Sequence, residues 1–233
     1  TAPARPVRPD DFWLLSQVPG IACVARDSKL QMFWSTEEFF RVPGVVDSVE
    51  DMMGTRLSDV LPACAARERE LIHQQVMSTG VPHSHYQLSS DSRVLCSVFP
   101  LDAEAFGHQG ILAVVKDARL EPRTVPMKRF PVLKTPVFQQ LDVLSTRELE
   151  VFYFVGLGLS TREIAAQMNR AEKTVEHHVN SIHTKLDTHT RSQLVRFASE
   201  RGIQAFSPTE WSFIVEGAQE VRREMNRSSL EIA

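Results

Sequence analysis

Polar side chains between Glu172 and Lys185 recur at the spacing of one face of a helix. Val175, Val179 and Ile182 recur at four and three residues and define the opposite, apolar face, which we expect to point inward. The outward residues are then Lys173, Glu176, His177, Asn180 and Ser181. A helix that presents such side chains can lie in a DNA major groove and reach base edges.

Basic residues around this helix are placed to hold phosphates. They include Arg162 near the start of the preceding helix, Lys173 and Lys185 within the helix, and Arg191 after it. The predicted DNA-contact residues together are Arg162, Lys173, Thr174, Glu176, His177, Asn180, Ser181, Lys185 and Arg191.

The elements that position these residues are predicted by capping patterns. Ser145 to Glu148 and Ser160 to Glu163 each follow the Ser-x-x-Glu capping box and open helices. A third helix is expected over 172–185, and a fourth over 190–201, which Gly202 ends. About three residues join the second and third helices, which is the geometry of a helix-turn-helix.

Residues 144–203 resemble the LuxR/GerE family of helix-turn-helix DNA-binding domains. The matching positions are spread over all four helices: Leu144, Arg147-Glu148, Glu150-Val151, Gly158, Glu163-Ile164-Ala165, Thr174-Val175, His178, Lys185-Leu186 and Arg191. The resemblance implies a four-helix domain that binds double-stranded DNA. It covers about a quarter of the chain.

Three positions depart from the family pattern. Glu176 stands where Lys or Arg is usual, and Asn180 stands where another basic residue is common. Glu accepts a hydrogen bond from cytosine N4 and Asn reads adenine, so we expect an unusual base preference and modest affinity. Ala171 replaces a capping Ser, at a cost of about 1 kcal/mol.

The first half of the chain predicts two strands, then helices, then three strands. The expected strands are 21–26, 30–34, 83–88, 93–101 and 111–116, with a short helix opened by a capping box at Ser35 to Glu38. A long helix over 65–78 is expected to place Leu71, Ile72, Val76 and Met77 on one side, and Gly80 to end it.

Residues 21–117 resemble a PAS sensory domain in the stretches Gly20 to Asp27 and Met53 to Pro62. PAS domains enclose small molecules between sheet and helices, or simply pack a core there. The candidate lining residues are Phe33, Phe40, Leu57, Ile72, Val76, Tyr86, Cys96 and Val98. The cofactor is unknown: haem-binding relatives place the ligating His near Arg69 rather than at His73, and the flavin motif is missing. His83 and His85 lack an evident third ligand, so no metal site is predicted.

Two further segments frame the helical half. Prolines at 122, 126, 131 and 136 predict an extended connector, which carries five basic residues against one acidic residue. After Gly202, Ser207 and Pro208 predict a helix start. Its apolar seam, expected to dock on the same chain or to pair with a second one, is Trp211, Ile214, Ala218, Val221 and Met225.

Composition excludes several classes. The 233 residues are 42% hydrophobic and 24% charged with a net charge of -3, which is typical of soluble globular proteins rather than disordered or membrane-spanning ones. Three distant cysteines predict no disulfide framework, and residues 1–9 lack a secretory pattern, so we expect a cytoplasmic protein. The sequence shows no P-loop, nucleophile elbow or receiver-type paired Asp motif, so we do not expect an enzyme.

The predicted fold class is α+β: a PAS-like antiparallel sheet with helices, a four-helix LuxR-type helix-turn-helix domain, and an extra C-terminal helix. The expected divisions are a sensory domain at 1–117, a linker at 118–137, a DNA-binding domain at 138–206 and an amphipathic helix at 207–233. The expected function is transcription regulation as a homodimer on palindromic DNA.

The expected partners are DNA, a small-molecule ligand and RNA polymerase, with no membrane contact. Two alternatives remain open. One is an acyl-homoserine-lactone quorum-sensing regulator, although the first domain is short for it. The other is a helix-turn-helix that binds protein instead of DNA, which Glu176 would permit.

Overall fold

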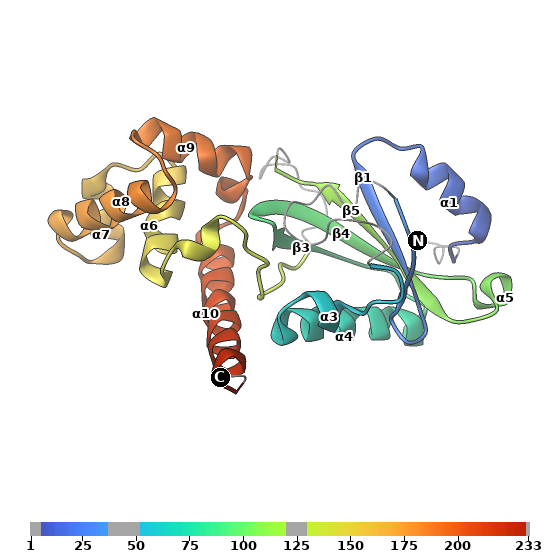
Figure 1. Cartoon of the computed structure of the whole chain (residues 1–233). Coiled ribbons are helices and arrows are strands. Elements are labelled where there is room, and N and C mark those ends of the chain that lie inside the picture. Colours follow the sequence, from blue (N-terminus) through green and yellow to red (C-terminus); the bar gives the residue numbers. More distant parts are fainter. Residues whose placement is uncertain (1–5, 37–51, 120–129, 232–233) are drawn as a thin grey trace.

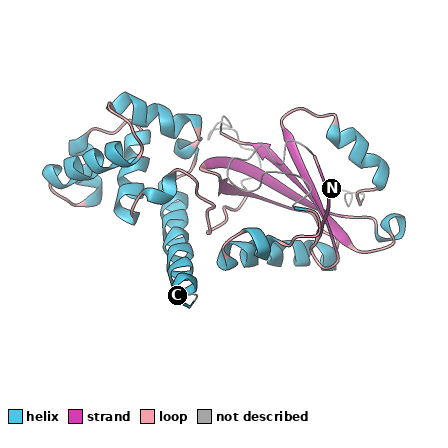
Figure 2. Cartoon of the chain, viewed as in Figure 1, coloured by secondary structure: helices cyan, strands magenta, loops and turns pink. Residues whose placement is uncertain are grey.

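Strands occupy one half of the molecule and helices the other (Figures 1 and 2). The structure, a computed structural model, describes residues 6–36, 52–119 and 130–231. The predicted capping box at 35–38 and Phe40 therefore fall wholly or partly outside the described residues.

The first half is built on a five-stranded antiparallel sheet of order β2-β1-β5-β4-β3. Its strands are β1 (Ile21–Asp27), β2 (Met32–Ser35), β3 (His83–Ser89), β4 (Ser92–Pro100) and β5 (Gly110–Asp117). The predicted order of two strands, helices and three strands is confirmed, with shifts of one or two residues at most ends. Ser90 and Asp91 join β3 to β4 with φ angles of 47° and 63°, as a tight hairpin with right-handed twist requires.

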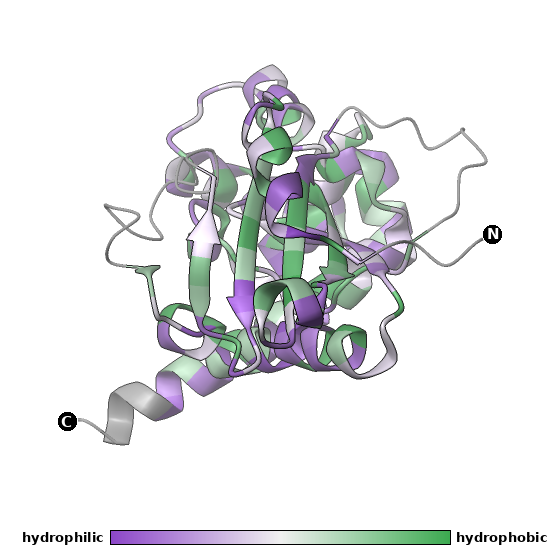
Figure 3. Cartoon of the chain, turned by 90° about the vertical axis from the view of Figure 1, so that its right-hand side faces the viewer, coloured by the Kyte–Doolittle hydropathy of each residue, from purple (hydrophilic) through white to green (hydrophobic). Residues whose placement is uncertain are grey.

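Helices cover both faces of this sheet. They are α1 (Pro9–Ser16), α3 (Leu57–Val60), α4 (Ala63–Thr79) and α5 (Ala103–Phe106). The long helix α4 runs along one face and α1 lies on the other (Figure 1). Helix α1 was not expected from the sequence; its first turn begins with Pro9 and its Phe12 is buried against the sheet. Figure 3 shows the strands coloured largely as hydrophobic, as burial between two layers demands.

The inward face of α4 differs from the one predicted. Leu71 is 59% exposed, so its assignment to the apolar side is wrong. The helix instead buries Ala65, Ala66, Arg69, His73 and Val76. Two long polar side chains thus occupy the sheet-facing stripe, because the space beneath α4 is a cavity with polar groups rather than a filled apolar core. Gly80 ends α4 with φ 67°, as predicted.

The second half is helical. Its elements are η2 (Leu141–Val143), α6 (Thr146–Gly156), α7 (Thr161–Met168), α8 (Glu172–Lys185), α9 (Arg191–Glu200), η3 (Ile203–Ala205) and α10 (Pro208–Glu231). Both predicted capping boxes are present, at Ser145 with Glu148 and at Ser160 with Glu163. The predicted fold class, an antiparallel sheet with helices followed by a helical helix-turn-helix region, is confirmed.

Helix α10 lies between the two halves and contacts both α6 and α4 (Figure 1). Trp211 stacks on Tyr153 with ring centroids 5.4 Å apart and donates to the Leu149 carbonyl at 3.0 Å. Of the predicted seam, Trp211, Ile214, Ala218 and Val221 are buried within the chain itself. Met225, the last residue of the predicted seam, is 48% exposed and lines a surface hollow together with Pro62 and Val221.

The connector also packs against the sheet. Val132 and Val137 form parallel bridges with Tyr86 and Ser89 of β3. Arg93 of β4 donates its backbone N–H to Arg201 at 2.9 Å, and Arg119 donates to the Glu200 carbonyl at 2.8 Å. The two halves therefore share a hydrogen-bonded interface. Among the described helices, none has the length and apolarity to cross a membrane.

Candidate nucleic-acid interface

Helices α7 and α8 meet through a three-residue turn, Asn169 to Ala171. Asn169 ends α7 in the left-handed region with φ 50°, which turns the chain sharply. Val175, Val179 and Ile182 of α8 are buried in the helical core, as predicted. The inward anchoring of α8 sets which of its side chains reach solvent.

Six of the predicted contact residues on α8 are exposed: Lys173, Thr174, Glu176, His177, Asn180 and Lys185. Helices α7 and α8 lie at the end of the molecule farthest from the sheet (Figure 1). Neither the first half of the chain nor α10 covers them in this view. The geometry leaves this face open to a partner as wide as a DNA groove.

Ser181 and Lys185, two of the predicted contact residues, have partners within the domain. Ser181 donates its hydroxyl to Glu148 Oε1 at 2.6 Å, and Lys185 Nζ pairs with Glu148 Oε2 at 2.7 Å. Glu148 is only 5% exposed and also accepts from the Ser145 backbone N–H at 2.6 Å. Burial raises the pKa of Glu148, but these bonds outweigh it and hold the pKa at about 2. Both side chains therefore fasten α8 to α6.

Arg191 is also engaged inside the domain. It is half-buried and donates Nη2 to the Leu159 carbonyl, which holds the start of α9 against the loop after α6. That Arg191 also contacts a phosphate stays a prediction. Arg162, in contrast, is exposed at the second residue of α7.

The start of α8 has no side-chain cap in the described part of the chain. Ala171 occupies the N-cap position in extended geometry, as the sequence predicted. The first N–H groups of α8 are thus left for water or an anion at the positive end of the helix dipole.

A second candidate site is the cavity beneath α4. Leu57 and Cys96 line it, as predicted. Ile72, Val76 and Val98 belong to the apolar cluster that adjoins it. Phe40 lies outside the described residues.

Phe33 and Tyr86 were assigned to this cavity wrongly. Phe33 packs with Phe12 and Phe106 on the other face of the sheet. Tyr86 also points to the other face, where the Arg93 guanidinium lies 3.8 Å from its ring centroid. The β-strand alternation places His85 and Gln87, not Tyr86, toward the cavity.

Sequence reasoning missed the polar groups of this cavity. Arg26, Arg69 and Gln87 line it together with His73 and His85. An arginine that ends the apolar run Ile21 to Ala25 was a usable signal, because a lone charge in such a strand needs a partner. In the described residues, no cluster of three metal-ligating side chains is found, including around His83 and His85.

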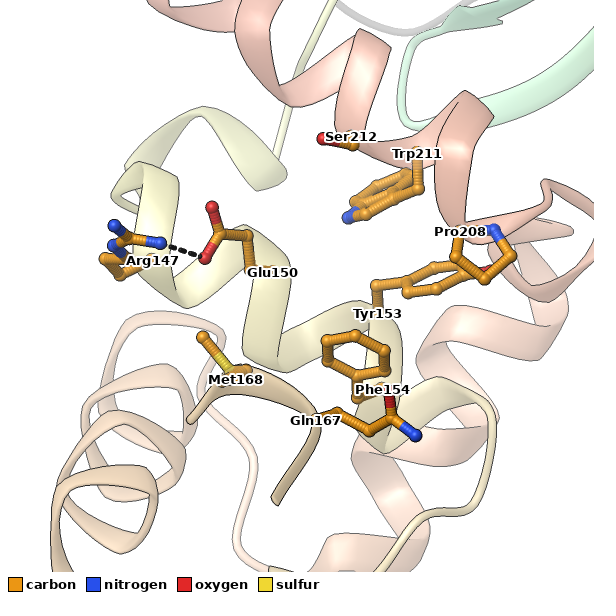
Figure 4. A pocket seen from close by; sticks show the side chains of 9 residues that line it. All are labelled: Arg147, Glu150, Tyr153, Phe154, Gln167, Met168, Pro208, Trp211 and Ser212. Carbon is orange, nitrogen blue, oxygen red and sulfur yellow. Dashed lines mark hydrogen bonds and ion pairs between the residues drawn. The ribbon is translucent and has the colours of Figure 1, made fainter. Parts of the chain in front are cut away.

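A surface hollow of about 220 Å³ lies where α6, α7 and α10 meet (Figure 4). Trp211, Tyr153 and Phe154 form its apolar side, and the ion pair between Arg147 and Glu150 lies at its rim. No residue of α8 lines this hollow among those described, so it is separate from the exposed face of α8.

Comparisons with known proteins agree with the helical half. A family model of the bacterial regulatory proteins of the luxR family, GerE, matches residues 142–198. The response regulator Rre1 of Synechocystis is 41% identical over 69 residues, which are 30% of this chain and 29% of that protein. The nitrate/nitrite response regulator protein NarP of Escherichia coli is 36% identical over 64 residues, 27% of this chain and 30% of NarP.

Solved structures of Vibrio cholerae VqmA, described as a LuxR-type receptor, align over more of the chain. One, without target DNA, is 21% identical with a TM-score of 0.42 and covers 88% of this chain and 93% of VqmA. A complex of VqmA with ligand and DNA is 18% identical with a TM-score of 0.43, and covers 88% and 92% of the two chains.

The matching segment spans less than a third of the length of each of the two curated relatives. It coincides with the part of the chain in which both capping boxes, the three-residue turn and the exposed face of α8 are found. Residues 142–198 of this chain are therefore a GerE-type helix-turn-helix domain of the luxR family of bacterial regulatory proteins.

Proposed function

We propose that this protein is a transcription regulator that binds specific DNA sequences through α8 and receives a signal in its PAS-like first half. The observation that carries the proposal is that α8 buries Val175, Val179 and Ile182 and exposes a row of polar side chains. The sensory domain is 1–117, the linker 118–137, the DNA-binding domain 138–206 and the terminal helix 207–233.

The exposed residues of α8 would each make a different contact with DNA. Glu176 would accept from cytosine N4 and Asn180 would bond adenine, while Lys173 and Arg162 would hold phosphates. His177 and Thr174 complete the row. This assignment differs from the first prediction because Ser181, Lys185 and Arg191 already have partners within the domain.

A homodimer follows from the size of the contact. One helix of 14 residues reads only a few base pairs, whereas two copies on a two-fold axis read a palindrome with half-sites about 10 bp apart. The spacing between the two copies of α8 would then control binding.

The connector supports coupling between the two halves. Val137 lines the cavity beneath α4, and Arg69 of that cavity donates to the Thr135 hydroxyl and carbonyl. Asp91, at the β3–β4 turn, accepts backbone N–H groups of Gln139, Gln140 and Leu141 just before α6. A change of cavity shape would move this connector and with it the start of the DNA-binding domain.

The test is selection of bound duplexes from fragmented genomic DNA, read by sequencing, at low and moderate salt. We expect enrichment of a two-fold motif and an affinity that falls steeply with salt, because phosphate contacts release counterions. DNA enrichment that does not change with salt concentration, or no enrichment at all, would favour a helix-turn-helix that binds protein.

Variants sharpen this test. Arg162→Ala should lower the slope of log affinity against log salt by about one per protomer, and Glu176→Lys should raise it. Arg147→Ala is the matched control, since Arg147 is exposed on α6 and pairs with Glu150 beside the hollow of Figure 4. Equal slopes for all three variants and the wild type would contradict the assignment of α8 and α7.

A further inference from the structure

The cavity beneath α4 has a volume of about 130 Å³ and mostly apolar walls. Met52, Leu57, Val60 and Ala113 are among its apolar lining residues. Burial there is costly for any polar group that lacks a hydrogen-bond partner. The polar groups that line the cavity therefore indicate the chemistry of the ligand that fits it.

Arg26 is the strongest of these groups, because it is completely buried on β1. Its Nη1 donates to the Leu30 carbonyl at 2.9 Å and to the Thr55 carbonyl at 2.8 Å. Its Nε and Nη2 have no partner among the described residues. These two nitrogens form one edge of the guanidinium, and that edge is the one that binds a carboxylate with two parallel hydrogen bonds.

The acidic residues nearest to Arg26 do not bond to it in the described part of the chain. Glu70, Asp59 and Asp27 act on it only through space. Glu70 Oε2 accepts from Arg56 Nη2 at 3.1 Å, and Asp59 Oδ2 accepts from the Arg56 backbone N–H at 2.8 Å. Burial lowers the pKa of Arg26 to about 10, so the guanidinium still carries its charge at pH 7.

Two buried histidines complete the polar side of the cavity. Nδ1 of His73 and both ring nitrogens of His85 lack partners among the described residues. Burial, together with the nearby arginines, lowers the pKa of each ring to about 3, so both are neutral at pH 7. A neutral imidazole offers one N–H donor and one acceptor, which suits a ligand with oxygens.

Arg69 differs from Arg26, although it too is buried. Its Nε donates to Gln87 at 3.0 Å, Nη1 donates to the Ala65 carbonyl and the Thr135 hydroxyl, and Nη2 donates to the Thr135 carbonyl. Among the described residues, the cavity thus holds one guanidinium whose nitrogens are all bonded and one with an unpaired edge.

We infer that this cavity binds a small monocarboxylate, whose carboxylate lies on the Nε–Nη2 edge of Arg26 and whose apolar part packs against Met52, Leu57 and Ala113. The inference rests on the proposed function, in which the first half receives the signal. A cavity of about 150 Å³ holds benzene, so a ligand of about six non-hydrogen atoms fits this slightly smaller cavity.

The decisive experiment is calorimetric titration of the full chain at pH 7 and constant ionic strength with matched pairs of compounds. Propionate, butyrate and benzoate are compared with propionamide, butyramide and benzamide at up to about 10 mM. We expect at least one acid to bind tenfold or more tightly than its amide, because only the acid offers two anionic acceptors. Equal affinities within every pair, or no binding of any acid, would overturn the inference.

Two conservative variants locate the effect. Arg26→Lys keeps the charge but removes the planar edge, and should reduce the preference of acid over amide about tenfold. Arg69→Lys is the matched control at the same cavity and should leave that preference nearly unchanged. If circular dichroism shows that Arg26→Lys is not folded, the inference is tested by the comparison of acids with amides on the wild-type chain.

Failure of this inference is separable from failure of the proposed function. The same protein preparation is used for DNA selection at two salt concentrations. DNA enrichment without any acid preference would overturn the ligand class and leave the regulator proposal in place. Preference for acids over amides without DNA enrichment would overturn the regulator proposal and leave the ligand class in place.

Discussion

Glu148 shows how one side chain can serve two parts of a domain. One oxygen closes the capping box at the start of α6, and the carboxylate as a whole also bonds Ser181 and Lys185 of α8. The residue matches the family pattern, but its sequence context explains only the cap. Its second role depends on α8 crossing α6 at that point.

We predict that Glu148→Gln lowers the free energy of unfolding by about 1–3 kcal/mol at pH 7, because it removes an ion pair and an anionic acceptor. Urea unfolding followed by circular dichroism measures the loss. Glu163→Gln is the matched control, since Glu163 holds the same place in a capping box but is exposed and bonds only Ser160 among the described residues. A loss as large in the control would contradict the role of α8.

The same variant tests a pH dependence. The pKa of Glu148 is about 2 in the folded chain against an ordinary value of 4.5. The carboxylate therefore stabilises the fold fully above pH 4.5, and this contribution disappears as the pH falls toward 2. The difference between wild type and Glu148→Gln should narrow over that interval; a constant difference would exclude the linkage.

At the scale of elements, α10 is the feature that departs most from a helix-turn-helix region alone. It buries Trp211 and Ile214 in the helical core and reaches α4 beyond it. Cys64 at the start of α4 donates its backbone N–H to Glu224 of α10 at 2.7 Å. Helix α10 thus contacts both halves of the chain and holds them together.

Gly217 permits this packing. A Cβ there would lie 2.0 Å from the Lys134 carbonyl oxygen, which is backbone and cannot yield easily. Alanine normally stabilises a helix by 0.5–1 kcal/mol relative to glycine, but we predict that Gly217→Ala destabilises the protein by about 1–3 kcal/mol. Thermal unfolding and the rate of proteolysis within α10 measure it.

Ser212→Ala provides the control for Gly217→Ala, because Ser212 is exposed on the same helix. It should change stability by less than about 0.5 kcal/mol. If Gly217→Ala matched or exceeded the wild type in stability, the close approach of α10 to the connector would be disproved.

At the scale of the whole molecule, the two halves are joined by specific polar contacts rather than by a loose linker. Asp91 accepts three backbone N–H groups from residues 139–141, and Arg201 donates to Gln140. Desolvation raises the pKa of Asp91 against the opposing effect of these N–H groups, so the contacts hold a buried carboxylate in place.

We predict that Asp91→Asn loosens this junction, because an amide supplies one acceptor oxygen where the carboxylate supplies two. The radius of gyration in solution scattering should rise, and thermal unfolding should separate into two transitions. Asp187→Asn is the control: it also has a left-handed φ, of 50°, but lies exposed beyond α8. Identical scattering of all three proteins would show that the junction does not depend on Asp91.

The sequence by itself determined most of the elements, although not α1, and the family resemblance of residues 142–198. Capping boxes and three- and four-residue periods depend on neighbours within one turn, so α6, α7, α8 and the inward face of α8 were predictable. The order of strands and helices along the chain was predictable for the same local reason, through alternation and turn residues. The order of the strands within the sheet was not predicted.

Only the tertiary structure decided which polar groups are free. Lys185 meets Glu148 across 37 residues, and Cys64 meets Glu224 across 160. Likewise, Leu71 is exposed while Arg69 and His73 are buried, because the sheet beneath α4 determines which stripe faces inward. Such pairings depend on how distant elements pack, and no local pattern records them. The same holds for Nε and Nη2 of Arg26, which have no partner among the described residues.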